Sequence, residues 1–333
     1  MNQPGVTIAI VNYRTREALH DCLRSLERVK DEVTLRIVVV DNASGDGSVE
    51  LIAARFPEVE LIPNSTNVGF ARAINQAFER CSTPFFMFLN PDTWVARHSI
   101  SRMVETLGQD PKIAVVGAQL TAFGGDPQPS VLAAPTLFKE FWNLLPELKS
   151  LLFLTPLQRA VARNRESRQG AQVMVEAVSG GALMVRSDAF REIGGLDDRF
   201  FLYHEEVDMC LALRQRGYRI VLAPDARILH HDALASGFRA SKLPADPVLT
   251  WRLMGKKLLF EKHGTKSQVK RYEQMASVLL NLRANAYRLL AIFHVAHRSA
   301  LRARADELAK AAKRLSQEHF PQPCPHPAHP AHT

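Results

Sequence analysis

Apolar and polar positions alternate in blocks along the first 120 residues, and these blocks predict short strands separated by amphipathic helices. VTIAIVNY (6–13) and TLRIVVVDN (34–42) are rich in Val and Ile, which is typical of strands buried on both faces. Between them, REALHDCLRSLERV (16–29) repeats apolar residues at helical spacing. The same patterns predict further strands at 59–64, 84–92 and 113–120, and further helices at 47–56, 69–81 and 99–110.

This alternation predicts an α/β fold in which helices cover both faces of a mostly parallel, Rossmann-like sheet. The pattern stops at 121–176, resumes at 176–195 and again from the acidic helix to 218–224, and gives way to helices alone from 247 to about 320. We therefore expect a sheet domain at 1–240 with an insertion at 121–176. A basic helical extension at 241–320 and a disordered Pro- and His-rich tail at 321–333 would follow.

Composition describes a globular chain with one unusual charge distribution. Hydrophobic residues make up 46% and charged residues 23%, enough to bury a core. The net charge of +8 is concentrated at 251–320, which holds 15 Lys and Arg against five Asp and Glu. Such a segment favours an anionic membrane surface or nucleic acid. The four cysteines have no paired or metal-type spacing, which indicates a reducing, cytoplasmic compartment.

Membrane contact is expected to be peripheral. No segment has about 18 uninterrupted apolar residues, and the N-terminal apolar run breaks at Asn12, as a buried strand would and a signal peptide would not. Two apolar stretches, 137–157 and 275–298, have the composition of helices that lie in a membrane interface. Packing within the chain, or between the C-terminal helices of a homodimer, also explains them and is slightly favoured. Both interpretations stay open.

Polar residues follow four predicted strands at the point where each strand ends. Each cluster alone fits a turn or a helix cap, but ligands of doubly wound sheets bind outside the carboxyl ends of the strands. Four such clusters at one edge therefore predict a polar binding crevice. Its members are Asn12 and Tyr13, Asp41 and Asn42, Asn67 and Gly69, and Asn90 and Asp92.

The crevice lacks the glycine-rich loops that usually cradle phosphates. No G-x-G-x-x-G follows the first strand and no G-x-x-x-x-G-K-S/T occurs. A nucleotide ligand would therefore need a cation, and Asp92 is a suitable oxygen ligand for Mg²⁺ or Mn²⁺. A second acidic cluster, Glu205, Glu206 and Asp208, begins a predicted helix, where carboxylates also serve as ordinary caps.

Taken in order, these motifs resemble the inverting family 2 glycosyltransferases of the GT-A type, over roughly residues 5–237. The resemblance implies a catalytic domain at 1–240, in which 121–176 lies on the acceptor side. The matching stretches are VNYR (11–14), VVDNASGDGS (39–48), NVGFARAIN (67–75), FLNPD (88–92), SGGALMVRSDAFREIGGLDDRFFLYHEEVDMCLALRQRGY (179–218) and APDARILHH (223–231).

The resemblance also implies a role for each matching residue. One group would bind the nucleotide sugar: Asn12, Tyr13, Asp41, Asn42, Asn67 and Gly69, with Gly181 close to a sugar. Asn90-Pro91-Asp92 replaces the usual Asp-x-Asp, which leaves Asp92 as the metal carboxylate, assisted by His230 or by the adjacent His231, of which His230 is favoured. Glu206 would be the general base, with Glu205 and Asp208 as supports, one near the acceptor and one capping the turn.

The Asn-Pro-Asp form resembles enzymes that transfer L-rhamnose from dTDP-L-rhamnose to saccharide or lipid-linked acceptors in cell-surface polysaccharide synthesis. A UDP-hexose or UDP-galactofuranose donor remains the alternative. Because no Gln-x-x-Arg-Trp occurs, single-sugar transfer is expected. Among the rivals, a sugar nucleotidyltransferase would need a glycine-rich N-terminal loop. A non-catalytic nucleotide-sugar binder would not need to retain Asp92, Glu206 and His230 together, and no nucleic-acid partner is expected.

Overall fold

The computed structural model describes residues 5–146, 173–231, 246–294 and 297–315. The second half of the apolar run at 137–157, and the tail predicted to be disordered at 321–333, lie outside these residues. All elements discussed below fall within them.

A central sheet of nine strands forms the middle layer of the molecule. Its strand order is β3-β2-β1-β4-β10-β6-β11-β5, with β8 paired to β11. Each predicted strand is confirmed to within about two residues at its start, whereas β11 continues well past the predicted end. The strands are β1 (Val6–Asn12), β2 (Leu35–Asp41), β3 (Glu60–Pro63), β4 (Phe85–Leu89), β5 (Thr93–Val95), β6 (Ile113–Thr121), β8 (Val173–Val175), β10 (Ala182–Arg186) and β11 (Arg219–His230).

The sheet is mostly parallel, as predicted, but three strands run against its direction. β1, β2, β3 and β4 are parallel neighbours, and so are β6 and β11. β10 runs antiparallel between β4 and β6, while β5 and β8 are antiparallel to β11. Because β10 is reversed, its first residue rather than its last lies beside the end of β4, where Ala182 pairs with Leu89.

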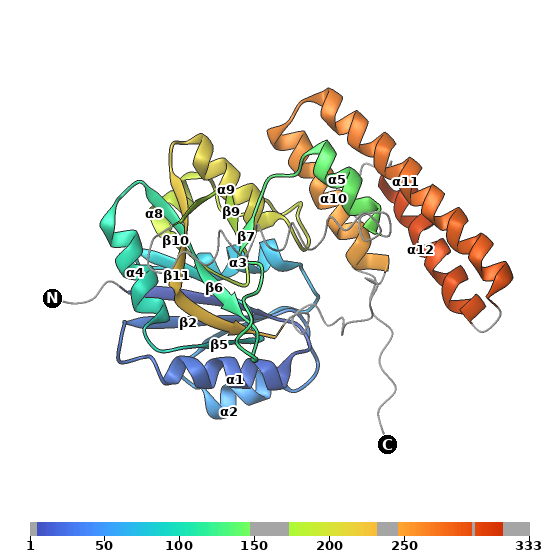
Figure 1. The fold of residues 1–333 in the computed structure, drawn as a ribbon. Helices are drawn as coiled ribbons and strands as arrows, with labels where there is room; N and C mark the ends of the chain where they lie inside the picture. The colour runs from blue at the N-terminus through green and yellow to red at the C-terminus, as the bar shows by residue number, and fades with distance from the viewer. Residues whose placement is uncertain (1–4, 147–172, 232–245, 295–296, 316–333) are drawn as a thin grey trace, which may run out of the picture.

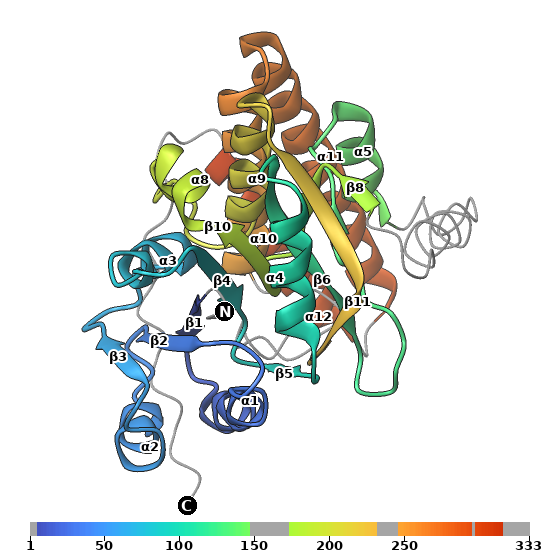
Figure 2. The same cartoon turned by 90° about the vertical axis from the view of Figure 1, so that its left-hand side faces the viewer.

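Helices cover both faces of the sheet because strand side chains alternate between two cores. Phe85 and Met87 of β4 point into the core shared with α1, α2 and α4, whereas Phe86 and Phe88 point into the core shared with α3, α8 and α9. Figures 1 and 2 show α1 and α2 on the opposite side of β1 and β2 from α3. The helices are α1 (Arg16–Glu27), α2 (Ser48–Arg55), α3 (Phe70–Phe78), α4 (Ser99–Gln109), α8 (Ser187–Glu192) and α9 (Glu205–Gln215).

A helical region at one side of the sheet has a core of its own. Its helices are α10 (Asp246–His263), α11 (Lys266–Phe293) and α12 (Arg298–Leu315), and α5 (Leu137–Leu144) packs against α11 (Figure 1). Tyr272 and Leu280 are fully buried at the centre of this cluster. The predicted C-terminal helical extension is thus confirmed, while its boundary at 240/241 stays a prediction. No described helix is long and apolar enough to span a bilayer.

Candidate active site

The predicted strand-end residues lie along one edge of the sheet. Strand register places Asn12 at the end of β1 directly beside Asp41 at the end of β2. Further along, β5 returns against the end of β11, so that Thr93 pairs with His230. The edge therefore carries one polar cluster at the ends of β1 and β2 and a second cluster where β4, β5 and β11 meet.

A closed hydrogen-bond network holds the cluster at the ends of β1 and β2. Asn12 donates to Asp41 Oδ1 at 2.7 Å and to Ser44 Oγ at 3.0 Å, and its Oδ1 accepts from Thr15. Asp41 also accepts from the backbone N–H and the hydroxyl of Ser44. Asn12, Asp41 and Ser44 are at most 4% exposed. The side chains of Asn12 and Asp41 therefore hold the turn, and their contact with a nucleotide stays a prediction.

The neighbouring predicted residues are held in the same way. Asn42 donates to the backbone carbonyl of Gly69 at 3.2 Å and accepts from Asn64. Asn67 accepts from the Gly69 N–H, as a residue before a helix does. Tyr13 is half-buried at the end of β1, and the Arg14 guanidinium lies 5.3 Å from its ring. This end of the edge is a rigid frame with Tyr13 at its margin.

Gly69 occupies a position that only glycine fits. Its φ is +87°, and a Cβ there would lie 2.7 Å from the backbone oxygen of Phe201. The next residue, Phe70, donates its N–H to the same oxygen. The start of α3 is thereby fastened to the segment that leads to the acidic helix α9. This contact joins the cluster at β1 and β2 to the acidic residues of α9.

Asp92 and His230, the predicted metal ligands, face each other. The Nε2 atom of His230 lies 3.4 Å from Asp92 Oδ1 and 3.3 Å from the side-chain nitrogen of Asn90. The side chain of Asp92 is fully buried and that of His230 is 13% exposed. His231 stacks its ring on Phe123 with 3.8 Å between the centroids. Of the two histidines, it is His230 that the fold brings to the carboxylate.

This donor set fits a divalent cation in part. A carboxylate oxygen and an imidazole nitrogen suit Mn²⁺, and the other ring nitrogen of His230 is engaged by Gln128, as is usual for a ligating histidine. The described residues contain no group of three or more His, Cys, Asp or Glu able to hold a metal alone. The remaining ligands would have to come from a substrate or from water.

One turn, residues 179–181, lies between Glu206, the predicted base, and Asn90, which follows the end of β4. The Glu206 side chain lies against Gly180: a Cβ added to Gly180 would lie 3.6 Å from the Cβ of Glu206. The next residue, Gly181, accepts a backbone hydrogen bond from Asn90 at 2.9 Å. The acidic helix and the end of β4 thus flank the same three residues.

The acidic start of α9 is poorly compensated. Among the described residues, Glu205 Oε2, Glu206 Oε2 and His204 Nε2 are buried without a hydrogen-bond partner. Burial raises the pKa of Glu206, and burial together with the Glu206 charge raises the pKa of Glu205 well above its usual range. Burial also lowers the pKa of His204 to about 3, which keeps its ring neutral. A carboxylate with a raised pKa and a free oxygen is suited to accept a proton.

The chain enters this helix in an unfavourable backbone conformation. Tyr203 and His204 have φ values of 73° and 76°, a region that non-glycine residues rarely adopt. Helix α10 packs on the same segment. The Arg252 guanidinium lies 4.5 Å from the centroid of the Tyr203 ring, and a Cβ added to Gly255 would lie 3.0 Å from the backbone oxygen of Tyr203. Such conformations persist where the surroundings hold them, and they are common at functional sites.

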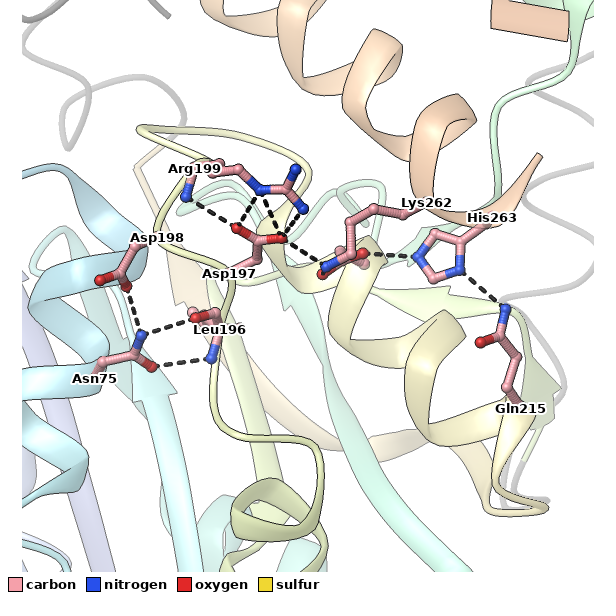
Figure 3. Close-up of polar contacts among 9 residues, drawn as sticks. Asn75, Leu196, Asp197, Asp198, Arg199, Gln215, Lys262 and His263 are labelled. Atoms are coloured by element: carbon pink, nitrogen blue, oxygen red, sulfur yellow. Dashed lines mark hydrogen bonds and ion pairs between the residues drawn. The ribbon is translucent and has the colours of Figure 1, made fainter. Parts of the chain in front are cut away.

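Asp208, predicted to be a support, is held by α10. Lys262 donates to its Oδ2 at 2.6 Å and His263 contacts its Oδ1 at 2.7 Å. Figure 3 shows Lys262 also reaching Asp197, which Arg199 engages from the other side. Burial acts to raise the pKa of Asp197, but the hydrogen bonds from Arg199 and Lys262 hold it well below its usual range. Asp208 thus anchors the C-terminal helices to α9.

The sequence patterns missed several residues that organise this site. Gln128 lies in the insertion, where no periodic pattern marked it. Lys262 and His263 end a helix, where basic residues are ordinary. Ser44 stood within a recognised motif, so its place two residues after Asn42 was the one available signal.

The chain matches the family model described as "Glycosyl transferase family 2" over residues 7–162. It is 27% identical over 249 residues to the N-acetylglucosaminyl-diphospho-decaprenol L-rhamnosyltransferase of Mycobacterium tuberculosis, covering 69% of this chain and 77% of that protein. It is 23% identical to the low-salt glycan biosynthesis hexosyltransferase Agl10 of Haloferax volcanii, covering 65% of this chain and 63% of that protein.

Two solved structures share the fold, which confirms the expected GT-A architecture. The mannosyltransferase PcManGT from Pyrobaculum calidifontis, in complex with GDP-Man and Mn²⁺, aligns with a TM-score of 0.53 at 18% identity, covering 95% of this chain and 88% of its own. GalNAc-T7 with UDP, GalNAc and Mn²⁺ aligns with a TM-score of 0.59 at 14% identity, covering 95% of this chain and 56% of its own.

Proposed function

From the match of residues 7–162 to the family 2 glycosyltransferase model, we propose that this protein is an inverting, metal-dependent, non-processive transferase. It moves one sugar from a nucleotide-sugar donor to a hydroxyl of a saccharide or lipid-linked saccharide. The observation that carries the proposal is the turn Ser179–Gly181, which contacts Glu206 on one side and the backbone of Asn90 on the other. Asp92 and His230 follow at the same edge.

In this proposal Glu206 is the general base. Its carboxylate removes the proton from the acceptor hydroxyl while the hydroxyl oxygen forms a bond to the anomeric carbon. The bond from that carbon to the diphosphate oxygen breaks on the opposite face, and its electron pair leaves with the nucleoside diphosphate. Attack from the face opposite the leaving group inverts the anomeric configuration. Base catalysis of this kind contributes about 10² to 10⁴-fold.

Asp92 and His230 are the proposed ligands for Mg²⁺ or Mn²⁺. When bound, the cation stabilises the negative charge of the leaving diphosphate. The two proteins of the same fold described above were solved with Mn²⁺, which supports a cation in this one. Replacement of the first acid of the family motif by Asn90 reduces the protein charge at the site. The diphosphate oxygens would therefore supply a larger share of the coordination.

We propose L-rhamnose, carried by dTDP, as the transferred sugar, because of the similarity to a rhamnosyltransferase whose name specifies a lipid-linked acceptor. The rigid frame of Asn12, Asp41 and Asn42 would shape the nucleotide pocket, with Tyr13, Asn67 and Gly69 at its margin. UDP-hexose and UDP-galactofuranose donors are the competing possibilities.

A donor panel tests the activity directly. Purified protein with Mn²⁺ or Mg²⁺ is given dTDP-L-rhamnose, UDP-galactofuranose, UDP-glucose or UDP-N-acetylglucosamine and a polyprenyl diphosphate N-acetylglucosamine acceptor. We expect acceptor-dependent release of dTDP, and its loss on chelation of the metal. Release of UDP from another donor would replace rhamnose while leaving a transferase. No release from any donor, with binding intact, would favour a non-catalytic binder.

We further propose that α11 rests on an anionic membrane surface, where a lipid-linked acceptor would be found. Its outer face carries a row of exposed apolar side chains, each at least 57% exposed. Helices α11 and α12 together hold 11 Lys and Arg against three Asp and Glu. Apolar side chains beside excess positive charge match the chemistry of an anionic leaflet. The row consists of Val278, Leu282, Leu289, Ile292 and Phe293.

Vesicle sedimentation tests this surface. The protein should sediment at low salt with phosphatidylglycerol vesicles and not with phosphatidylcholine vesicles. The double variant Leu282→Gln, Leu289→Gln should stay in solution, whereas Met174→Gln, a change at a 69% exposed residue of the sheet domain, should sediment normally. If instead the wild type does not bind vesicles but forms a dimer, and the double variant is a monomer, α11 is a homodimer contact.

A further inference from the structure

Gln128 contacts His230 twice. Its side-chain nitrogen donates to the backbone oxygen of His230 at 3.0 Å, and its Oε1 lies 2.9 Å from the Nδ1 atom of the His230 ring. The two residues are 102 positions apart, and the insertion 121–176 brings Gln128 to the end of β11. One side-chain amide thus contacts both the backbone and the ring of the same histidine.

The backbone contact fixes which way round the amide lies. A carbonyl oxygen only accepts hydrogen bonds, so the group of Gln128 that faces it must be the NH₂. The other end of the amide, Oε1, is then the group that faces Nδ1, and it too only accepts. The hydrogen of a neutral His230 ring must therefore be on Nδ1, which leaves the lone pair of Nε2 unprotonated.

That lone pair is on the side of the ring that faces the proposed metal site. Nε2 lies 3.3 Å from the Asn90 amide nitrogen and 3.4 Å from Asp92 Oδ1. With the opposite tautomer, an N–H would face this site and Nε2 could not bind a cation. The choice of tautomer therefore decides whether His230 is a ligand.

Gln128 is itself held in place by its backbone. The backbone N–H of Gln128 donates to the backbone oxygen of Leu120 at 2.9 Å. The backbone oxygen of Gln128 accepts from the Ser130 hydroxyl at 2.9 Å and from the side-chain amide of Gln119 at 3.3 Å. Gln119 and Ser130 are both at most 6% exposed. The amide is therefore positioned before any ligand arrives.

We propose that Gln128 is a positioning residue that holds His230 in the Nδ1–H tautomer and so presents Nε2 to the divalent cation. The inference rests on the proposed metal site at Asp92 and His230. It assigns a function to the start of the insertion, which fastens β11 to the metal side of the crevice.

Mn²⁺ binding by the purified full chain, measured by calorimetry in the presence of dTDP, provides the first test. Gln128→Leu should weaken binding by about 10 to 100-fold, the usual cost of losing such a partner. Gln128→Glu keeps an acceptor for Nδ1–H and should bind within about threefold of wild type. Gln215→Leu is the control, since Gln215 contacts the ring of a different histidine: its side-chain nitrogen lies 3.0 Å from the Nδ1 atom of His263 (Figure 3).

Nitrogen NMR of metal-free protein with ¹⁵N-labelled histidine provides a readout that does not depend on the metal. We expect wild type and Gln128→Glu to show His230 protonated at Nδ1, and Gln128→Leu to show a mixture of tautomers. A role limited to bracing the His230 backbone predicts that Glu, which cannot donate to the His230 oxygen, is as damaging as Leu. That result would overturn the proposal.

The metal site and the role of Gln128 can be disproved separately. If Asp92→Asn and His230→Ala leave Mn²⁺ affinity unchanged, the proposed metal site is wrong. If both weaken binding while Gln128→Leu binds like wild type, the metal site stands and the role of Gln128 is wrong.

Discussion

The two ends of the sheet edge differ in how well their polar groups are satisfied. At the β1 and β2 end, the buried side chains of Asn12 and Asp41 form hydrogen bonds with each other, with Thr15 and with Ser44. At the α9 end, Glu205 and Glu206 each bury an oxygen that has no partner among the described residues. Their approach also runs through two residues with positive φ.

The difference separates a frame from a reactive group. Satisfied buried networks stabilise a fold and fix geometry, whereas an uncompensated carboxylate costs stability and gains basicity. The frame must hold its shape whether or not a nucleotide is bound. The acidic end needs an unsatisfied oxygen if it is to take a proton from an acceptor. The comparison predicts that substitutions at the two ends change different quantities.

The largest effect is expected at the acidic end. Glu206→Gln should lower kcat by at least about 10²-fold, because an amide cannot take up the proton of the hydroxyl to which the sugar is transferred. Thermal stability should be unchanged or higher, since a carboxyl group with a buried, unpaired oxygen is removed. The same change at Glu50, an exposed carboxylate in the first turn of α2, is the control. If Glu206→Gln transfers sugar at the wild-type rate, the two ends do not differ as argued.

The frame should respond in stability. Asp41→Ala should lower the free energy of unfolding by about 1–3 kcal/mol, because buried donors of Asn12 and Ser44 lose their acceptor. Urea denaturation measures this loss, and Asp21→Ala, at a side chain 69% exposed, should change it little. An unfolding curve for Asp41→Ala that overlays the wild type would show that the network is not a frame.

A smaller effect is expected where α10 fastens the acidic helix. Lys262→Met removes the ammonium that contacts both Asp208 and Asp197. The free energy of unfolding should fall by about 1 kcal/mol, since the pair is only partly buried. The rate should fall a few-fold with the donor KM unchanged, because Glu206 shares the first turn of α9 with Asp208. Lys266→Met, at the first position of α11, is the matched control; an equal loss there would refute a specific anchor.

The smallest effect concerns pH. Folding raises the pKa of Glu205, so the folded state holds this proton more tightly than the unfolded state. Its contribution to stability is therefore present at pH values below the ordinary carboxyl pKa and is lost as pH rises. Glu205→Gln should have a higher Tm than wild type at pH 8, with the gap closing near pH 4. Melting curves across this range should show a gap that widens with pH; a constant gap would exclude the linkage.

Much of the fold followed from local pattern, but some strand directions did not. Val- and Ile-rich runs and helical periodicity located the long elements, since these report burial of individual segments. The reversed direction of β10, and the three-residue strand β5, depend on which segments pair in space. A strand of three residues carries no periodic signal. β5 is nevertheless the element that brings Asp92 to His230.

The sequence by itself determined which residues stand at the strand ends and at the start of the acidic helix, because each position is local to one element. Only the tertiary structure decided their surroundings. It joined Gln128 to His230, fastened Asp208 to α10, and buried one oxygen of Glu206 without a hydrogen-bond partner. The physical reason is that hydrogen-bond partners and desolvation are set by segments distant in the chain, which no short motif encodes.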